Sequence, residues 1–220
     1  MALFESRIRA DTDSGQMVGQ TGRTICRSPA GRIWTLVLDW TNSQLLVAYS
    51  NDSGQTWATE VIESAVVGQH SLCIDSKGNL HVAYGILGGV DTLNYRKRDV
   101  STGAWSAATV IQTAVGFDIS GISIFCDKDD RIHLVWCTQE PVFGTLDYAA
   151  LYKKWDGSWG ATEIANLVTG YDALECSGAV DADGVVHIAV MSTGYGLYPN
   201  RYSLVYNRRL AGGWRGANQI

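Results

Sequence analysis

Three histidines, His81, His133 and His187, stand at matching places in the sequence and could bind a metal ion together. Each follows a turn and alternates with aliphatic residues, as in "NLHVAY" and "RIHLVW", which is typical of a strand. No Cys or carboxylate partner stands at the close spacing of zinc sites around them. We therefore expect each histidine to lie between two layers of the fold and to bond a neighbouring backbone group. We expect neither a metal ion nor another cofactor.

Three carboxylates recur just ahead of these histidines: Asp75, Asp127 and Asp181. Paired carboxylates can serve as acid and base. Here each is followed at once by turn residues, as in "DSKG", "DKDD" and "DADG". Asp is favoured in turns because its side chain accepts hydrogen bonds from nearby backbone amides. We expect these residues to form turns rather than to catalyse.

The segment "SNDSGQTW", residues 50–57, combines hydroxyl, carboxylate, glycine and indole groups in eight residues. Gly at its centre permits a positive φ, and the Ser, Asp and Thr side chains can bond to local backbone. Trp offers a large apolar surface. These properties indicate a hairpin turn, so we expect a structural role for Ser50, Asp52, Gly54, Thr56 and Trp57.

The elements that carry these residues repeat along the chain. One Trp recurs as Trp57, Trp105, Trp159 and Trp214, and one Tyr recurs as Tyr49, Tyr95, Tyr152 and Tyr206. Each unit of about 50 residues contains four short strand-like runs, which is the pattern of a propeller blade. A β-sandwich would not predict the same aromatic in every unit. The prediction is an all-β propeller of four-stranded antiparallel blades, at about 22–62, 70–111, 120–165 and 174–220, preceded by the segment 1–21.

Composition excludes several classes of function. The chain has 220 residues, 46% of them hydrophobic, and a net charge of −5, which gives no reason to expect nucleic acid or an anionic membrane as partner. No apolar run is long enough to span a bilayer, and no signal-peptide pattern is present. The five cysteines show no zinc spacing. We expect free thiols in a chain that folds in a reducing cytosol.

The segment 50–57 resembles the Asp-box, S-x-D-x-G-x-T-W, of sialidase-type BNR propellers, and three degenerate copies end in the other recurring tryptophans. The resemblance implies that this turn lies opposite the ligand face. It also implies an arginine triad, a Tyr–Glu nucleophile pair and an Asp acid/base. The chain offers Arg23, Arg27 and Arg32 but lacks the Arg-Ile-Pro signature of that family, so we assign no catalytic residue.

Function is expected on the variable loops, because loops on a rigid scaffold usually carry it. We expect binding groups on loops 85–91, 137–147 and 192–202. Aromatic side chains beside amide and guanidinium groups suit sugar stacking or a protein contact. The candidate ligand-binding residues are Trp40, Phe143, Tyr195, Tyr198, Asn200 and Arg201. The alternative is that the aromatic residues of these loops fold back onto their own blades.

Two hypotheses for function follow. The first is a non-enzymatic recognition or structural module that binds glycan or a protein surface, as part of a bacteriophage tail or capsid and displayed outside the cell. The alternative is a sialidase-type glycoside hydrolase. Four blades can close a ring, residues 1–21 can supply a closing strand, or the blades belong to a larger or partner-completed propeller. An open arc would expose sheet edges and depend on a homo-oligomer or larger assembly.

Overall fold

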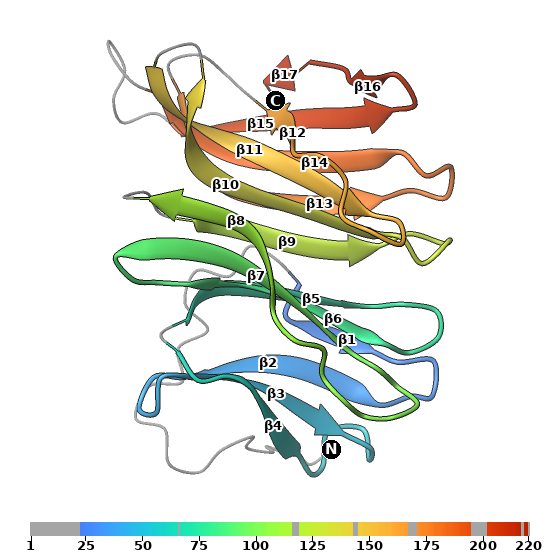
Figure 1. Ribbon diagram of the computed structural model, residues 1–220. Helices are drawn as coiled ribbons and strands as arrows, with labels where there is room; N and C mark the ends of the chain where they lie inside the picture. The colour runs from blue at the N-terminus through green and yellow to red at the C-terminus, as the bar shows by residue number, and fades with distance from the viewer. Residues whose placement is uncertain are drawn as a thin grey trace, which may run out of the picture.

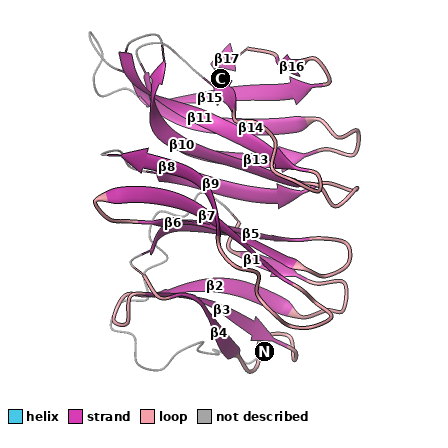
Figure 2. Ribbon diagram, in the orientation of Figure 1, coloured by secondary structure: helices cyan, strands magenta, loops and turns pink. Residues whose placement is uncertain are grey.

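The computed structural model describes residues 23–65, 67–115, 119–142, 145–166, 171–194, 202–216 and 218–219. Within these ranges every regular element is a β-strand, and none is a helix that could cross a membrane. The strands form four antiparallel sheets that follow one another along the chain and stack in an arc (Figures 1 and 2). The all-β prediction is therefore confirmed.

Each sheet is an up-and-down meander in which consecutive strands are hydrogen-bonded neighbours. We call the four sheets blades one to four. Blade one contains β1 (Ile25–Arg27), β2 (Ile33–Asp39), β3 (Gln44–Ser50) and β4 (Ala58–Glu63). Blade two contains β5 (Val67–Ile74), β6 (Leu80–Ile86), β7 (Val90–Arg98) and β8 (Thr109–Val115). Blade three contains β9 (Ile119–Cys126), β10 (Ile132–Val142), β11 (Thr145–Trp155) and β12 (Glu163–Asn166).

Blade four contains β13 (Tyr171–Val180), β14 (Val186–Gly194), β15 (Tyr202–Leu210), β16 (Gly213–Trp214) and β17 (Asn218–Gln219). The last two strands are short and both pair with β15, so together they form a fourth strand in two pieces. The first strands of successive blades, β1, β5, β9 and β13, contact one another along the inside of the arc. Figure 1 places blade one and blade four at opposite ends of the stack.

The hydrophobic core is divided into three clusters, each filling the space between two successive blades. Alternate residues of a strand point to opposite faces, so blade two and blade three, which have a blade on each side, each contribute to two clusters. In blade three, Leu134 and Trp136 pack toward blade two, whereas Val135 and Cys137 pack toward blade four. We call the side of a blade that faces the preceding blade its backward face, and the other side its forward face.

Polar contacts repeat across these interfaces at equivalent positions. Glu60 of β4 accepts hydrogen bonds from Arg98 Nε and Nη2 at 2.8 Å each and from the Trp105 indole N–H at 3.1 Å. Between blades three and four, Glu163 receives Arg209 at 2.7 and 2.9 Å and the indole of Trp214 at 3.0 Å. Bidentate Arg–carboxylate pairs add geometric specificity as well as energy, so these glutamates help to hold neighbouring blades together.

The antiparallel path gives each blade two distinct ends. The turns from first to second strand and from third to fourth strand lie at one end, which we call the turn end. The connections from second to third strand, and from one blade to the next, lie at the other, which we call the loop end (Figure 1). Residues 50–57 lie at the turn end, and Trp40 lies at the loop end.

Candidate functional site

The recurring histidines, aspartates and tyrosines meet in three equivalent groups at the turn end. In blade three, His133 Nδ1 lies 2.7 Å from the Tyr152 hydroxyl, and its Nε2 lies 3.2 Å from Asp127 Oδ2. His81 and His187 repeat this arrangement, with the aspartate and tyrosine of blades two and four. Our expectation that each histidine bonds a backbone group was therefore wrong, because side chains of its own blade supply both partners.

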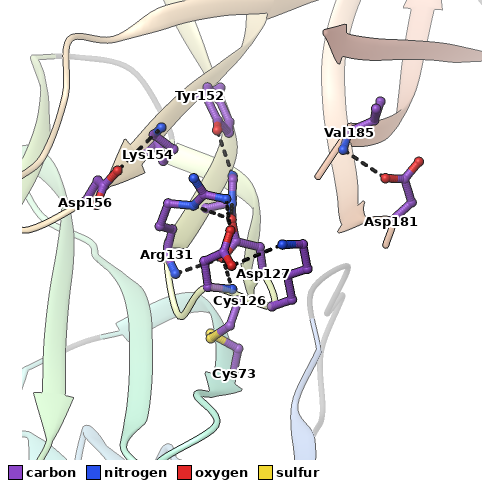
Figure 3. Close-up of polar contacts among 12 residues, drawn as sticks. Cys73, Cys126, Asp127, Arg131, Tyr152, Lys154, Asp156, Asp181 and Val185 are labelled. Carbon is purple, nitrogen blue, oxygen red and sulfur yellow. Dashed lines mark hydrogen bonds and ion pairs between the residues drawn. The ribbon is translucent and has the colours of Figure 1, made fainter. Parts of the chain in front are cut away.

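Asp127 is the centre of the group in blade three. Figure 3 shows Arg131 directed toward the Asp127 carboxylate and the Tyr152 hydroxyl directed into the same group. Burial alone would raise the pKa of Asp127, but the hydrogen bonds from Arg131 and His133 outweigh it and hold that pKa below its usual range. Burial lowers the pKa of His133 and raises that of Tyr152. The ionised carboxylate, neutral imidazole and neutral phenol form a satisfied network, which makes this group a brace rather than an acid/base pair.

Hydrogen bonds within residues 50–57 are local. Ser50 Oγ accepts the Gly54 amide at 2.8 Å, and Asp52 accepts the Thr56 amide at 2.9 Å and the Thr56 hydroxyl at 2.5 Å. The Thr56 hydroxyl and amide hold the pKa of Asp52 at about 2. Gly54 has a φ of +91°, which a residue with a Cβ rarely adopts. These side chains are engaged in the turn itself.

Two of the arginines near the start of the sequence also lie at the turn end. Arg27 Nε donates to the carbonyl of Gly31 at 3.1 Å, within the same turn. Arg32 Nε donates to Asn51 Oδ1 at 2.6 Å and lies over the rings of Trp34 and Tyr49. These contacts leave no arginine cluster from Arg27 and Arg32 at the loop end.

Of the candidate ligand-binding residues, Trp40 is at the loop end with 44% of its surface exposed. It follows Asp39, a buried carboxylate that accepts the backbone and side-chain amides of Asn42 at 3.2 and 2.8 Å. An exposed indole next to a fixed turn can stack on a flat or ring-shaped ligand. The other five candidates lie outside the described residues: Phe143, Tyr195, Tyr198, Asn200 and Arg201.

A second set of polar residues lies on the inner strands, and sequence reasoning missed it. The first strand of each of blades two, three and four carries a register shift. In β5 the shift lies between Val67 and His70, and in β13 it lies between Ala173 and Glu175. In β9 it lies opposite Val135 and Cys137 of the neighbouring strand β10. Such bulges re-aim side chains and are common next to active sites. They place Gln69, Gly121 and Glu175 at equivalent positions, which we call the channel site.

Gln69 Nε2 donates to Glu175 Oε1 at 3.1 Å, although the two residues belong to blades two and four. A hydrogen bond that passes over blade three must run along the concave side of the arc. Gly121 makes this possible, because an added Cβ would stand 2.6 Å from the Cys176 amide nitrogen and force β13 away from β9. The channel site therefore depends on close contact between two inner strands.

Glu175 Oε2 is buried and accepts no hydrogen bond from the residues that the structure describes. The hydroxyls of Thr138 and Ser192, on the second strands of blades three and four, share this property. An unsatisfied buried polar atom costs about 1–3 kcal/mol, so such atoms in a native fold need an explanation. A ligand group or ordered water that reaches the inside of the arc would supply the missing partners.

Tyr84 and Glu63 form a further pair at the loop end, between blades one and two. The Tyr84 hydroxyl donates to Glu63 Oε2 at 3.0 Å, and Glu63 Oε1 accepts the Ser64 amide at 2.9 Å. Tyr84 is fully buried, and burial together with Glu63 raises its pKa above the usual range. The phenol thus stays protonated and orients the carboxylate, but it is not a nucleophile in this arrangement.

The sequence contained a weak signal for the channel site. Aligning the units on the histidines brings Gln69, Gly121 and Glu175 into register, but these residue types differ, whereas the tryptophans and tyrosines are identical. The Tyr84–Glu63 pair had no signal, because its members belong to different units and meet only when blades one and two pack. Of the described residues, none form a group of three or more His, Cys, Asp or Glu side chains that could hold a metal ion.

The four-bladed arc, the inner strands and the repeated braces define a β-propeller fold. Neither the protein-family models nor the curated proteins contain a match to this chain. Among solved structures, the chain is similar to an α-L-arabinanase of Penicillium chrysogenum complexed with arabinobiose, at a TM-score of 0.67 and 10% identity. The match covers 89% of this chain and 65% of the arabinanase chain.

Two further structures show the same likeness. A PL25 polysaccharide lyase, an ulvan lyase, has a TM-score of 0.61 at 13% identity, with 89% of this chain and 54% of the lyase covered. A Hadza microbial sialidase has a TM-score of 0.55 at 12% identity, with 90% and 58% covered. This chain thus spans about half to two thirds of the length of these structures. At such identities the likeness shows the fold alone.

Proposed function

We propose that this protein binds an oligosaccharide along the loop end and the inside of the arc, and cleaves it as a glycoside hydrolase. The observation that carries the proposal is the channel site, where a carboxylate of blade four and an amide of blade two meet. Bulges aim both side chains inward, and one carboxylate oxygen is buried without a described partner. Support also comes from the similar structures, which are named for enzymes that act on glycans.

Glycoside hydrolysis ordinarily needs two carboxyl groups, one to protonate the leaving oxygen and one to act as base or nucleophile. We assign Glu175 as one of them, with the Gln69 amide holding its Oε1 and leaving Oε2 for the substrate. Glu63, which Tyr84 orients at the loop end, lies on the outermost strand of blade one, so we assign it a contact to the substrate and not the role of the second carboxyl group. Trp40 supplies an exposed apolar plate on which a sugar ring can stack.

The test is a glycan array followed by product analysis on every glycan that binds. We expect Glu175→Gln to lower turnover at least about 100-fold while the dissociation constant for the glycan changes little, because loss of a positioned acid or base typically costs 10²–10⁴-fold. The matched control is Asp183→Asn, a carboxylate at the exposed turn end, which should leave turnover unchanged. Equal turnover of Glu175→Gln and the wild type would refute the assignment.

A second candidate is a recognition module that binds glycan or protein without cleavage. It is favoured by the fully buried Tyr84 and by the position of Arg27 and Arg32 at the turn end, away from the channel site. In this form the protein folds in a reducing cytosol and is displayed on a bacteriophage tail or capsid. Glycan binding by the wild type without any product would favour this candidate, and mass spectrometry of purified virions would test its location.

A further inference from the structure

The forward face of blade four is the fourth copy of a surface that is buried in the other blades. Equivalent positions in blades two and three are closed by the next blade: Leu93 and Ala150 are both 0% exposed. Their counterpart in blade four, Leu204, is 48% exposed. Met191, the counterpart of the fully buried Cys137, is 37% exposed. An apolar hollow of about 250 Å³ lies between them and is also lined by Glu175 of the channel site, Cys176, Ser177 and Ala189.

The Asp–His–Tyr braces show the same contrast. The side chains of His81 and His133 are 3% and 4% exposed, whereas that of His187 is 33% exposed. In the inner interfaces a tryptophan of the next blade packs edge-on against the brace tyrosine. Trp159 lies 5.1 Å from Tyr95, and Trp214 lies 5.3 Å from Tyr152. Tyr206 is the tyrosine at this position in blade four, and it is only half-buried.

The opposite end of the arc presents the complementary surface. Ile25, on the backward face of blade one, is 58% exposed. Its counterparts in blades two and three are Leu72 and Ile124, at 0% and 1%, which pack against the preceding blade. One chain therefore carries, at its two ends, both halves of the interface that repeats three times within it.

We propose that two copies of this chain associate head to tail, with the backward face of blade one of one copy on the forward face of blade four of the other. Ile25 then meets the hollow between Met191 and Leu204. The internal interfaces also predict a polar contact, because Ser71 Oγ and Ser123 Oγ accept the amides of Ile124 and Gly178 in the next blade, at 3.2 Å each. Ser177 and the amide of Ile25 are the equivalent pair between copies.

The proposed interface is heterologous, because two different surfaces meet, so association closes a ring or continues as a chain of copies. A symmetric dimer through blade four alone would not use Ile25. The two geometries therefore differ in which substitutions disrupt them. This difference makes the proposal testable without knowledge of the final number of copies.

The experiment measures the mass of the full chain in solution by light scattering after gel filtration. The wild type should give at least twice the monomer mass of 23.9 kDa. Ile25→Glu and Leu204→Glu should each give the monomer, because each places a charge in an apolar contact. An equimolar mixture of the two variants should restore a dimer, since each variant keeps the face that the other has lost.

Both substituted side chains are exposed in the monomer, so circular dichroism spectra and melting temperatures of the isolated variants should match each other. A monomeric wild type at its highest soluble concentration would overturn the proposal. So would a mixture that stays monomeric, or an Ile25→Glu variant that keeps the wild-type mass. The last result would indicate a symmetric contact through blade four instead.

Discussion

Replacing Asp127 by Ala should destabilise the fold far more than the same change at Asp181, although the two residues occupy equivalent turns. The Asp127 carboxylate accepts four hydrogen bonds: from the amides of Asp129 and Arg131 at 2.9 Å, from Arg131 Nε at 2.7 Å and from His133 Nε2 at 3.2 Å. The Asp127 side chain is 2% exposed and that of His133 is 4% exposed. Its removal leaves a buried imidazole nitrogen without its acceptor.

The magnitude follows from these contacts. An unpaired buried polar group costs about 1–3 kcal/mol, and loss of the partly exposed Arg131 pair adds up to about 1 kcal/mol. A total of about 3 kcal/mol corresponds to a fall in melting temperature of roughly 6–12 °C for a chain of this length. In blade four, Asp181 and His187 are 40% and 33% exposed, so water can replace the lost contacts. Asp181→Ala should therefore lower the melting temperature only slightly.

Both substitutions are best compared in the Leu204→Glu background, which keeps the forward face of blade four open. Thermal unfolding followed by circular dichroism gives the two melting temperatures, and urea unfolding followed by tryptophan fluorescence checks them. Equal decreases in melting temperature for the two variants would refute the reasoning. They would show that burial of the aspartate by the next blade does not determine how much stability its removal costs.

Three further predictions follow from single contacts. Burial lowers the pKa of His70 from 6.5 to about 4, so the unfolded chain binds protons more tightly than the fold. The contribution of His70 to the free energy of unfolding should therefore be highest above pH 6.5 and should fall, by at most about 3 kcal/mol, as the pH is lowered toward 4. In urea titrations, the free energy of unfolding of His70→Gln should depend less on pH in this range than that of the wild type. Glu163→Gln and Glu60→Gln should each lower the free energy of unfolding by about 1 kcal/mol in urea titrations, because each breaks a partly exposed Arg clamp between blades, whereas Asp183→Asn should not. Cys73 and Cys126 lie in different blades with their sulfurs 2.6 Å apart. A small-molecule disulfide should therefore oxidise them to a disulfide by thiol exchange and release its two halves as thiols. Mass spectrometry should find the crosslinked peptides in the wild type and not in Cys73→Ser.

The sequence predicted what depends on repetition. The tryptophan and tyrosine series predicted four-stranded units because equivalent residues pack in the same way at successive interfaces between blades, as Trp159 on Tyr95 and Trp214 on Tyr152 show. Alternation around His81, His133 and His187 placed them on the second strands, where the structure has them. Turn residues after Asp75 and Asp127 predicted the turns, in which each carboxylate accepts backbone amides.

The channel site could not be predicted in this way, because it depends on differences between units. Gln69 and Glu175 come from blades two and four and meet only because bulges turn both strands inward. A bulge inserts one extra, unpaired residue into a strand. The residue types of the strand do not reveal where that insertion lies. The Asp–His–Tyr braces were within reach of the sequence, since the spacing of the aspartate and histidine is constant, but only the register of neighbouring strands shows that the tyrosine completes them.

The most direct test of the proposed function locates the bound glycan on the protein. Hydrogen–deuterium exchange should be measured with and without a glycan that the array identifies, with the full chain in both samples. The proposal predicts slower exchange at the inner-strand bulges, residues 67–70, 119–122 and 173–176, and unchanged exchange at the turn end, residues 50–57 and 127–131. Protection confined to the turn end would contradict the proposal that the channel site binds the glycan.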